Sequence, residues 1–156
     1  MPLATSASSD PVYIPATGGS EAGPRPRGRV VTNEPLHVAS RASPAFGFRE
    51  HTFRFLASGE DTAGSYSTME IASPYDTGPR PHIHAEAEES FFLLDGEVMF
   101  EVAGTRYNVK PGGFVHVPRG TVHHFRVLSP SARMIATYAP AGEEQGFREV
   151  ATPLDN

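Results

Sequence analysis

The chain has 156 residues, of which 38% are hydrophobic and 20% are charged, and its formal net charge is −5. This length suits one domain with a sizeable core, and the negative charge argues against a nucleic-acid-binding surface. The sequence has no cysteine, which excludes disulfides and cysteine-based zinc sites and favours a cytoplasmic location, and it has no apolar run long enough for a signal peptide or a membrane helix.

The first 45 residues form the predicted N-terminal arm. Residues 1–28 contain five Pro, four Gly and four Ser, with few large apolar side chains between them. Such a composition is typical of a flexible tail. An extended arm that packs on a partner subunit is the other interpretation, because residues 12–14 and 30–31 are apolar enough to form short edge strands. Both interpretations begin the folded domain at residue 46.

Residues 46–156 have the pattern of a β domain. Short segments rich in Phe, Val, Tyr and Thr alternate with turn residues. Asp95-Gly96 predicts a hairpin between two of the strands, and residues 142–151 carry the one helical pattern in this part of the sequence. The predicted strands, in chain order, are residues 48–57, 66–72, 90–95, 97–103, 105–110, 112–118, 123–129 and 132–140. This series predicts an all-β sandwich or barrel.

Two histidines stand near the start of the most informative stretch, which reads PRPHIHAEAEESFFLLDGE. Residues two apart in a strand point to the same side, so His82 and His84 are predicted to share one face. Two imidazoles inside an apolar barrel are costly unless they share a function, and neutral imidazole is the commonest protein metal ligand. Glu89 can reach the same ion if the chain bends back after His84. Its neighbour Glu88 competes for this role, but alternation groups Glu89 with the apolar side chains of its strand.

A fourth metal ligand is predicted in VPRGTVHHF, residues 117–125. By alternation alone, either His123 or His124 could point inward. Phe125 and Val127 share the phase of His123 and are apolar, so His123 is assigned to the interior. The remaining histidines are interpreted as surface or packing residues, with the last of them pointing outward: His37, His51 and His116.

These two stretches resemble the two sequence motifs of the cupin family. GPRPHIHAEAEESFFLLDG matches the first motif and GGFVHVPRGTVHHF matches the second, both without any change in spacing. The matching positions are Gly78, His82, His84, Glu89 and Gly96 in the first motif, and Gly112, Pro118, Gly120 and His123 in the second. One position departs, because Val127 stands where the motif often ends with Asn. The resemblance implies a cupin double-stranded β-helix, a jelly-roll barrel with one divalent metal on His82, His84, Glu89 and His123.

The ligand set indicates which metals suit the site and what charge the site carries. Three imidazoles and a carboxylate suit Fe(II), Mn(II), Co(II), Ni(II) or Zn(II), and cellular availability makes iron the first expectation. With these ligands a divalent ion keeps a net charge of +1, which favours an anionic substrate oxygen.

Strand alternation predicts an apolar lining of the pocket around the metal that suits a flat aromatic substrate, unless these side chains simply fill the core. The candidate pocket residues are Met69, Phe91, Phe100, Phe114, Phe125, Met134 and Tyr138.

A finer resemblance concerns the segments on either side of the motifs. FRFLASGEDTAGSYSTMEI and ATYAPAGEEQGFREVA are similar to the entry and exit segments of single-domain cupins related to quercetin dioxygenases. This resemblance implies ring-opening dioxygenation of a flavonol: the substrate binds through its deprotonated 3-hydroxyl, O₂ adds and carbon monoxide leaves, with Glu89 as metal ligand and catalytic base. Two other functions stay open. One is a non-redox cyclase, isomerase or lyase of a polyketide or dicarbonyl, and the other is a non-catalytic small-molecule-binding cupin.

The expected assembly is a homodimer. A small barrel has exposed sheet edges that need covering, and strand addition from residues 10–45 of a partner would cover them. The helical pattern of residues 142–151 predicts a short helix or lid across the mouth of the barrel.

Overall fold

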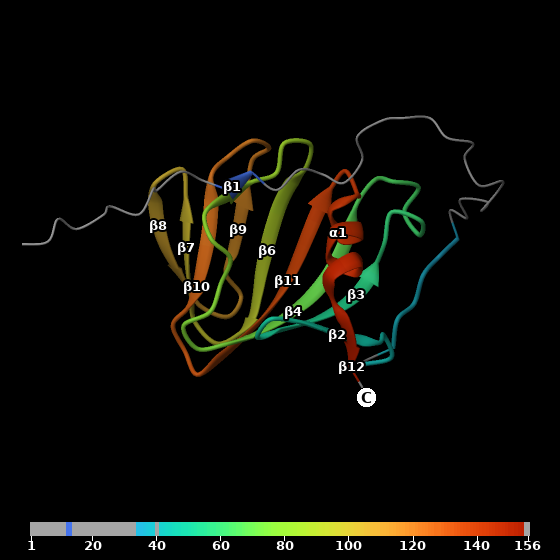
Figure 1. Ribbon diagram of the computed structural model, residues 1–156, viewed down its shortest axis with the longest axis horizontal. Coiled ribbons are helices and arrows are strands. Elements are labelled where there is room, and N and C mark those ends of the chain that lie inside the picture. Colours follow the sequence, from blue (N-terminus) through green and yellow to red (C-terminus); the bar gives the residue numbers. More distant parts are fainter. Residues whose placement is uncertain (1–11, 14–33, 40, 155–156) are drawn as a thin grey trace, which may run out of the picture.

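The computed structural model describes residues 12–13, 34–39 and 41–154, and every statement on structure below refers to these residues. They form two β-sheets and one helix (Figure 1). The predicted all-β class is therefore confirmed. Most of the predicted arm, including the expected strand at residues 30–31, lies outside the described residues.

The described elements are short strands, as the sequence pattern predicts. In chain order they are β1 (Val12–Tyr13), β2 (Ala45–Phe48), β3 (His51–Ala57), β4 (Ser67–Pro74), β5 (His82–Ile83), β6 (Glu88–Asp95), β7 (Val98–Val102), β8 (Thr105–Val109), β9 (Phe114–Val117), β10 (His123–Val127), β11 (Ser131–Ala139), helix α1 (Glu143–Val150) and β12 (Thr152–Leu154).

The two sheets are wound together by repeated crossings of the chain. One sheet has the order β1-β5-β10-β7-β8, and the other has the order β12-β2-β3-β4-β11-β6-β9. The neighbours pair in antiparallel fashion apart from β1 and β5. Between β4 and β11 the chain changes sheet at every connection except that from β7 to β8. Such winding brings residues that are distant in the sequence to one end of the barrel, and it confirms the predicted jelly roll.

Two details of the predicted strand series are wrong. The strand predicted for residues 48–57 begins later, since only residues 51–57 form β3. Phe48 is the last residue of β2, and the chain reverses at Arg49, whose φ is 53°. Asp95-Gly96 makes a turn but no hairpin, since β6 pairs with β9 and β11 while β7 pairs with β8 and β10. A local turn signal specifies that the chain reverses, whereas the pairing partner is chosen by burial across the whole barrel. Strand β12 was not predicted.

The core lies between the two sheets and follows the alternation of the strands. Met69 on β4 and Met134 on β11 are fully buried, as is Phe100 on β7 of the other sheet. Burial of one side chain of this size contributes roughly 1.5–3 kcal/mol relative to leaving it exposed. Val127, which stands where the cupin motif often has Asn, is also fully buried and belongs to the same core cluster.

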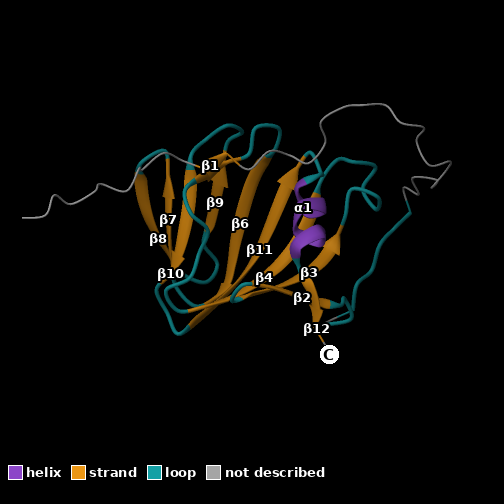
Figure 2. Cartoon of the chain, in the orientation of Figure 1, coloured by secondary structure: helices purple, strands orange, loops and turns teal. Residues whose placement is uncertain are grey.

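Helix α1 lies against β3 and β11 (Figure 2). The Phe147 ring lies 5.1 Å from that of Phe53 and 6.3 Å from that of Tyr138. Glu143 and Glu144 stand in the first turn, where carboxylates complement the helix dipole. The predicted short helix is therefore confirmed, and its first turn points two carboxylates toward the interior, where both are buried.

One described segment of the arm, strand β1, pairs within its own chain. Strand β1 adds in parallel to β5, with Val12 opposite His82. The predicted homodimer involves a second chain and stays a prediction. Among the described residues, no helix is long and apolar enough to cross a membrane.

Candidate metal centre

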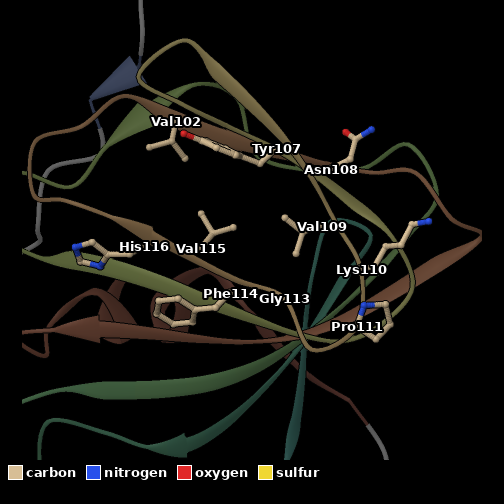
Figure 3. Close-up of a pocket in the computed structure, with 10 residues that line it drawn as sticks. All are labelled: Val102, Tyr107, Asn108, Val109, Lys110, Pro111, Gly113, Phe114, Val115 and His116. Carbon is tan, nitrogen blue, oxygen red and sulfur yellow. The ribbon is translucent and has the colours of Figure 1, made fainter.

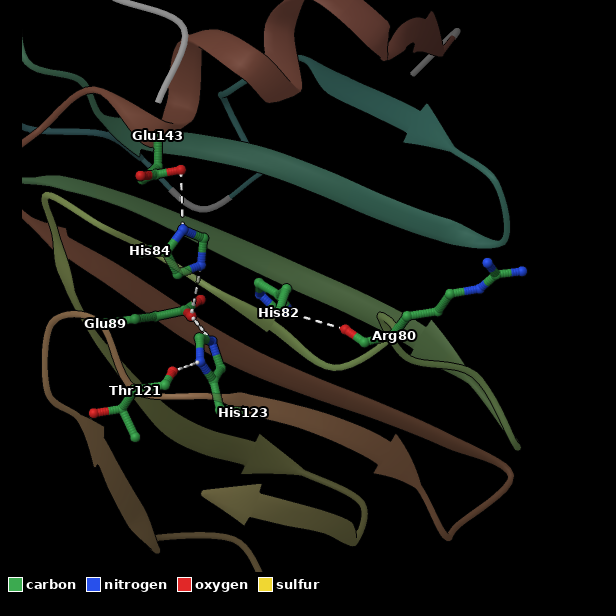
Figure 4. A network of polar contacts seen from close by, with 7 residues as sticks. All are labelled: Arg80, His82, His84, Glu89, Thr121, His123 and Glu143. Atoms are coloured by element: carbon green, nitrogen blue, oxygen red, sulfur yellow. Dashed lines mark hydrogen bonds and ion pairs between the residues drawn. The ribbon is translucent and has the colours of Figure 1, made fainter. Parts of the chain in front are cut away.

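Four predicted ligands from both sheets meet inside the barrel. His82 begins β5, His84 follows that strand, Glu89 lies on β6 and His123 begins β10. Their exposed fractions are 6%, 4%, 3% and 2%, respectively. One ligand atom from each residue lies within 4.8 Å of the other three (Figure 4). Alternation explains the inward direction, because His123 shares its phase with buried Phe125, as predicted.

Backbone carbonyls orient two of the imidazole rings. Nδ1–H of His82 donates to the Arg80 carbonyl over 2.8 Å, and Nδ1–H of His123 donates to the Thr121 carbonyl over 2.9 Å. Each bond occupies Nδ1 and leaves Nε2 as the ring nitrogen that faces the cluster. Nε2 of His123 lies 2.8 Å from Oε2 of Glu89. Fixing the far nitrogen in this way is how proteins orient metal-binding histidines.

His84 has carboxylates on both sides. Its Nε2 lies 3.2 Å from Oε2 of Glu89, and its Nδ1 lies 3.0 Å from Oε2 of Glu143 on α1 (Figure 4). Both distances fit ion pairs, but neither ring nitrogen makes a hydrogen bond of good geometry within the described residues. A buried imidazole in this state is costly unless another group takes up Nε2. The Glu143 carboxylate thus has the place that the backbone carbonyls have for the other two rings.

The cluster shifts the pKa values of its members in opposite directions. Burial lowers the pKa of His82 to about 4, and the neighbouring His123 adds to this. Burial also disfavours the charged form of His84, but its contacts with Glu143 and Glu89 outweigh this effect and raise the pKa to about 9. Burial disfavours the Glu89 carboxylate as well, but His123 and His84 lower its pKa to about 2. At neutral pH, Glu89 is therefore an anion.

The donor set fits a divalent transition-metal ion. It offers three imidazoles and one carboxylate, with Nε2 of His82 and of His123 facing the cluster and Nε2 of His84 without a hydrogen bond of good geometry. Metal–nitrogen bonds of about 2.1 Å would require only small inward shifts from a spread of 4.8 Å. The ligands suit iron, manganese, cobalt, nickel and zinc alike, so they do not select one metal.

Three residues of the cluster, His82, His84 and Glu89, form part of the wall of a cavity of about 590 Å³. This volume lies within the range of small-molecule sites. The apolar part of the wall comes mainly from Phe48, Phe53, Ile71, Phe91, Phe125, Tyr138 and Phe147, and the charged part comes from Arg49, Arg80, Glu143 and Glu149. The cavity can therefore take an apolar molecule that presents an oxygen to the cluster.

The sequence of this chain matches that of a known protein family. The sequence profile of the Cupin domain family matches residues 69–143. The chain is a cupin domain protein. The matched region contains both histidine-bearing stretches, so the predicted family resemblance is confirmed.

Two proteins similar to this cupin are named for different reactions. Quercetin 2,3-dioxygenase of Bacillus subtilis (strain 168) is 28% identical over 102 residues, which are 65% of this chain and 30% of that enzyme. The chain therefore spans less than a third of the length of this relative. The structure of polyketide cyclase RemF from Streptomyces resistomycificus has a TM-score of 0.59 and 25% identity, over 68% of this chain and 80% of that one. An RmlC-like cupin from Shewanella frigidimarina NCIMB 400 has a TM-score of 0.61 and 16% identity over 71% and 96% of the two chains, which shows the fold alone.

The first glycine of the cupin motif has a steric role here. A Cβ atom at Gly78 would lie 1.9 Å from the carbonyl oxygen of Phe125. No side chain fits at that distance, so glycine lets the loop before His82 lie directly against β10. This close approach helps to bring His82 and His123 together, and their rings are 4.3 Å apart.

The predicted pocket residues have three different environments. Phe91, Phe125 and Tyr138 line the cavity next to the cluster. Met69, Phe100 and Met134 are buried in the core and are absent from the cavity wall, so the alternative interpretation of core filling holds for them. Alternation separates the inside of a barrel from the outside, but it carries no information on depth along the barrel.

The assignment of Phe114 to the pocket is wrong. Phe114 is 63% exposed and lines a separate hollow of about 640 Å³ beside β8 and β9 (Figure 3). Val115 and Val117 occupy the inward phase of β9, so Phe114 and His116 point outward. The outward prediction for His116 is confirmed. This second hollow has one histidine and no carboxylate in its wall, and it therefore lacks a metal-binding set.

Sequence reasoning missed two polar residues of the cavity wall. Glu143 contacts His84, although it belongs to a helix that closes the domain. His51 was interpreted as a surface or packing residue, but it is half-buried and lines the cavity. Two adjacent glutamates at the start of an otherwise amphipathic helix were a weak signal for Glu143. For His51 the sequence offered none.

Proposed function

We propose that this cupin is a metal-dependent dioxygenase that acts on an aromatic or enolisable small molecule, such as a flavonol. The observation that carries the proposal is the buried three-histidine, one-glutamate cluster, which presents His82, His84 and Glu89 to a largely apolar cavity of about 590 Å³. The fold hosts many reactions and does not choose among them. The 28% identity to quercetin 2,3-dioxygenase supports this reaction class.

A redox-active divalent ion on the four ligands would acidify a bound substrate hydroxyl and supply the electronic coupling to O₂. The residues of the chain have distinct tasks. Glu89 presents an ionised carboxylate to the cavity, and in this proposal it accepts the proton of the substrate hydroxyl, which the bound ion would acidify. Phe91 and Phe125 offer flat apolar surfaces to an aromatic ring.

The reaction proposed for a flavonol is ring opening. Loss of the 3-hydroxyl proton to Glu89 makes the substrate electron-rich. Both atoms of O₂ enter the organic product, and one ring carbon leaves with its oxygen as carbon monoxide. The apolar wall and the burial of the ligands limit the access of water to the reacting carbon.

Oxygen consumption tests the proposal directly. The metal-free protein is loaded in turn with Fe(II), Mn(II), Co(II), Ni(II) and Zn(II), and O₂ uptake is measured with a panel of flavonols and 1,3-dicarbonyls. We expect substrate-dependent uptake with at least one redox-active metal and none with Zn(II). Stoichiometric metal binding without uptake for any metal would refute the dioxygenase assignment.

The role of Glu89 has its own test. Glu89→Gln keeps the size of the side chain but removes the carboxylate that accepts the proton. We expect O₂ uptake to fall by about 100-fold or more, within the range for loss of a general base. Full turnover with full metal content in this variant would show that Glu89 is not the base.

A non-redox cyclase, isomerase or lyase is the second candidate. The similarity to polyketide cyclase RemF favours it, at 25% identity and a TM-score of 0.59. In that case the ion would act as a Lewis acid on a polyketide or dicarbonyl, and Zn(II) without air would support product formation. Ligand binding without product under any of these conditions would indicate a non-catalytic binding cupin.

A further inference from the structure

His51 is a histidine of the cavity that does not belong to the metal cluster. It begins β3, and its Nδ1 lies 2.7 Å from the hydroxyl oxygen of Ser73 on β4. This is the one hydrogen bond of the His51 side chain within the described part of the protein. Because Ser73 occupies Nδ1, the second ring nitrogen, Nε2, is left for a ligand in the cavity that His51 lines.

The ring of His51 is held in place by its aromatic neighbours. Its centroid lies 6.1 Å from that of Phe53 and 6.3 Å from that of Phe125, and both phenyl rings line the same cavity. Ser73 is buried, with 2% exposure, and faces inward on β4. A hydrogen bond on one side and ring contacts on the other fix the plane of the imidazole before any ligand arrives.

His51 is a neutral group at neutral pH. Burial lowers the pKa of the imidazole, Arg49 lowers it further, and Glu50 opposes them. A neutral imidazole offers one donor and one acceptor, and the Ser73 hydroxyl can satisfy either at Nδ1. Nε2 is then the complementary donor or acceptor. A substrate hydroxyl matches both states, because a hydroxyl donates and accepts.

We propose that His51 is the second polar anchor of the cavity and that it binds, through Nε2, an oxygen of a substrate held by its other end at the metal cluster. This rests on the proposed function in one respect, namely that a small molecule places an oxygen at the cluster. The two rings beside His51, those of Phe53 and Phe125, carry no hydrogen-bonding group. The other hydrogen-bond donors to an oxygen in this wall include the side chains of Arg49 and Arg80. The inference narrows the substrate class to aromatic or enolisable molecules with a second hydroxyl or carbonyl group away from the metal-binding end.

Two flavonols distinguish this anchor from general apolar contact. 3-Hydroxyflavone has no hydroxyl besides the one for the metal, whereas quercetin has further hydroxyls on both ring systems. Dissociation constants are measured with the full-length, Zn(II)-loaded protein, in which no oxidation consumes the ligand. We expect native protein to bind quercetin about tenfold more tightly than 3-hydroxyflavone, the effect of one neutral hydrogen bond.

Substitutions at His51 make the test specific. His51→Phe keeps an aromatic ring but removes Nε2, and His51→Gln places its amide near the position of Nε2. We expect His51→Phe to weaken quercetin binding about tenfold and to change 3-hydroxyflavone binding less than twofold, while His51→Gln retains most of the preference. His116→Phe, at an exposed position on β9, is the matched control and should change neither constant.

The outcomes separate this inference from the proposed function. Equal weakening of both ligands by His51→Phe, or no weakening of either, would overturn the anchor, as would failure of both ligands to bind a folded, zinc-loaded protein. His84→Ala should abolish binding of both ligands by removing the metal end. If His84→Ala leaves binding intact while the His51→Phe difference persists, the metal-centred function fails, whereas the contact between His51 and a ligand oxygen stands.

Discussion

Metal binding should release the proton of His84 near pH 7.5. Its contacts with Glu143 and Glu89 raise the pKa of His84 to about 9 in the metal-free chain despite burial, so this imidazole is largely protonated at pH 7.5. A metal requires the neutral ring, so that proton must leave. His82 has a pKa of about 4 and Glu89 a pKa of about 2, so both are already deprotonated.

The proton release should also make the metal affinity depend on pH. The apparent affinity should rise about tenfold per pH unit, or about 1.4 kcal/mol, from pH 7 until the pKa of His84 is passed near pH 9. Calorimetric titration of the metal-free chain in several buffers of different ionisation enthalpy counts the released protons. Ni(II) suits this measurement better than Zn(II), because zinc-bound water itself can ionise near pH 7 and add to the count.

Adjacent glutamates on α1 provide a variant and its control. Glu143→Gln removes the charge that lies 3.0 Å from Nδ1 of His84, so the pKa of His84 should fall and fewer protons should be released at pH 7.5. Glu144→Gln should leave the proton count unchanged, because Glu144 accepts hydrogen bonds from the backbone N–H groups of Gly59 and Gly142 instead. Equal proton release by native protein and Glu143→Gln, or an affinity that does not change between pH 7 and 9, would refute the reasoning.

Three further predictions follow from the same geometry. His123→Ala should lose most of its bound metal whereas His124→Ala, on the outward phase of β10, should keep it, as measured by metal analysis after dialysis; equal losses would exclude His123 as a ligand. The metal-free chain should lose up to about 3 kcal/mol of stability as pH falls from 6.5 toward 4, because the folded state binds fewer protons at buried His82 than the unfolded state does; urea unfolding across this range checks it, and a flat profile contradicts it. Sedimentation should show a homodimer, and removal of residues 1–45 should yield a monomer; an unchanged dimer would exclude the arm as the dimer contact.

The metal ligands could be predicted because their pattern is local. Alternation with a period of two places Glu89 on the inward phase of β6, and apolar Phe125 chooses His123 over His124 in the same way. The outward direction of Phe114 follows from the same rule, since Phe114 shares the phase of His116, and its apolar character does not change that direction.

Other features could not be predicted because they depend on which segments meet. Asp95-Gly96 signals a reversal, but β6 and β7 pair with different strands because each sheet must bury its inner face. Glu143 reaches His84 only because α1 folds back over β3 and β11. No spacing rule links the two residues, since their separation in sequence is unrelated to their distance in the barrel.

By itself the sequence determined the all-β class, the family and the four residues of the cluster, since alternation, turn chemistry and motif spacing act over a few residues. The tertiary structure decided the rest of the site. It brought Ser73 to one nitrogen of His51, placed His51 in the cavity wall, and divided the inward aromatic residues between cavity wall and core. These outcomes arise from the winding of the chain between two sheets, which sets the depth and the neighbours of every inward side chain.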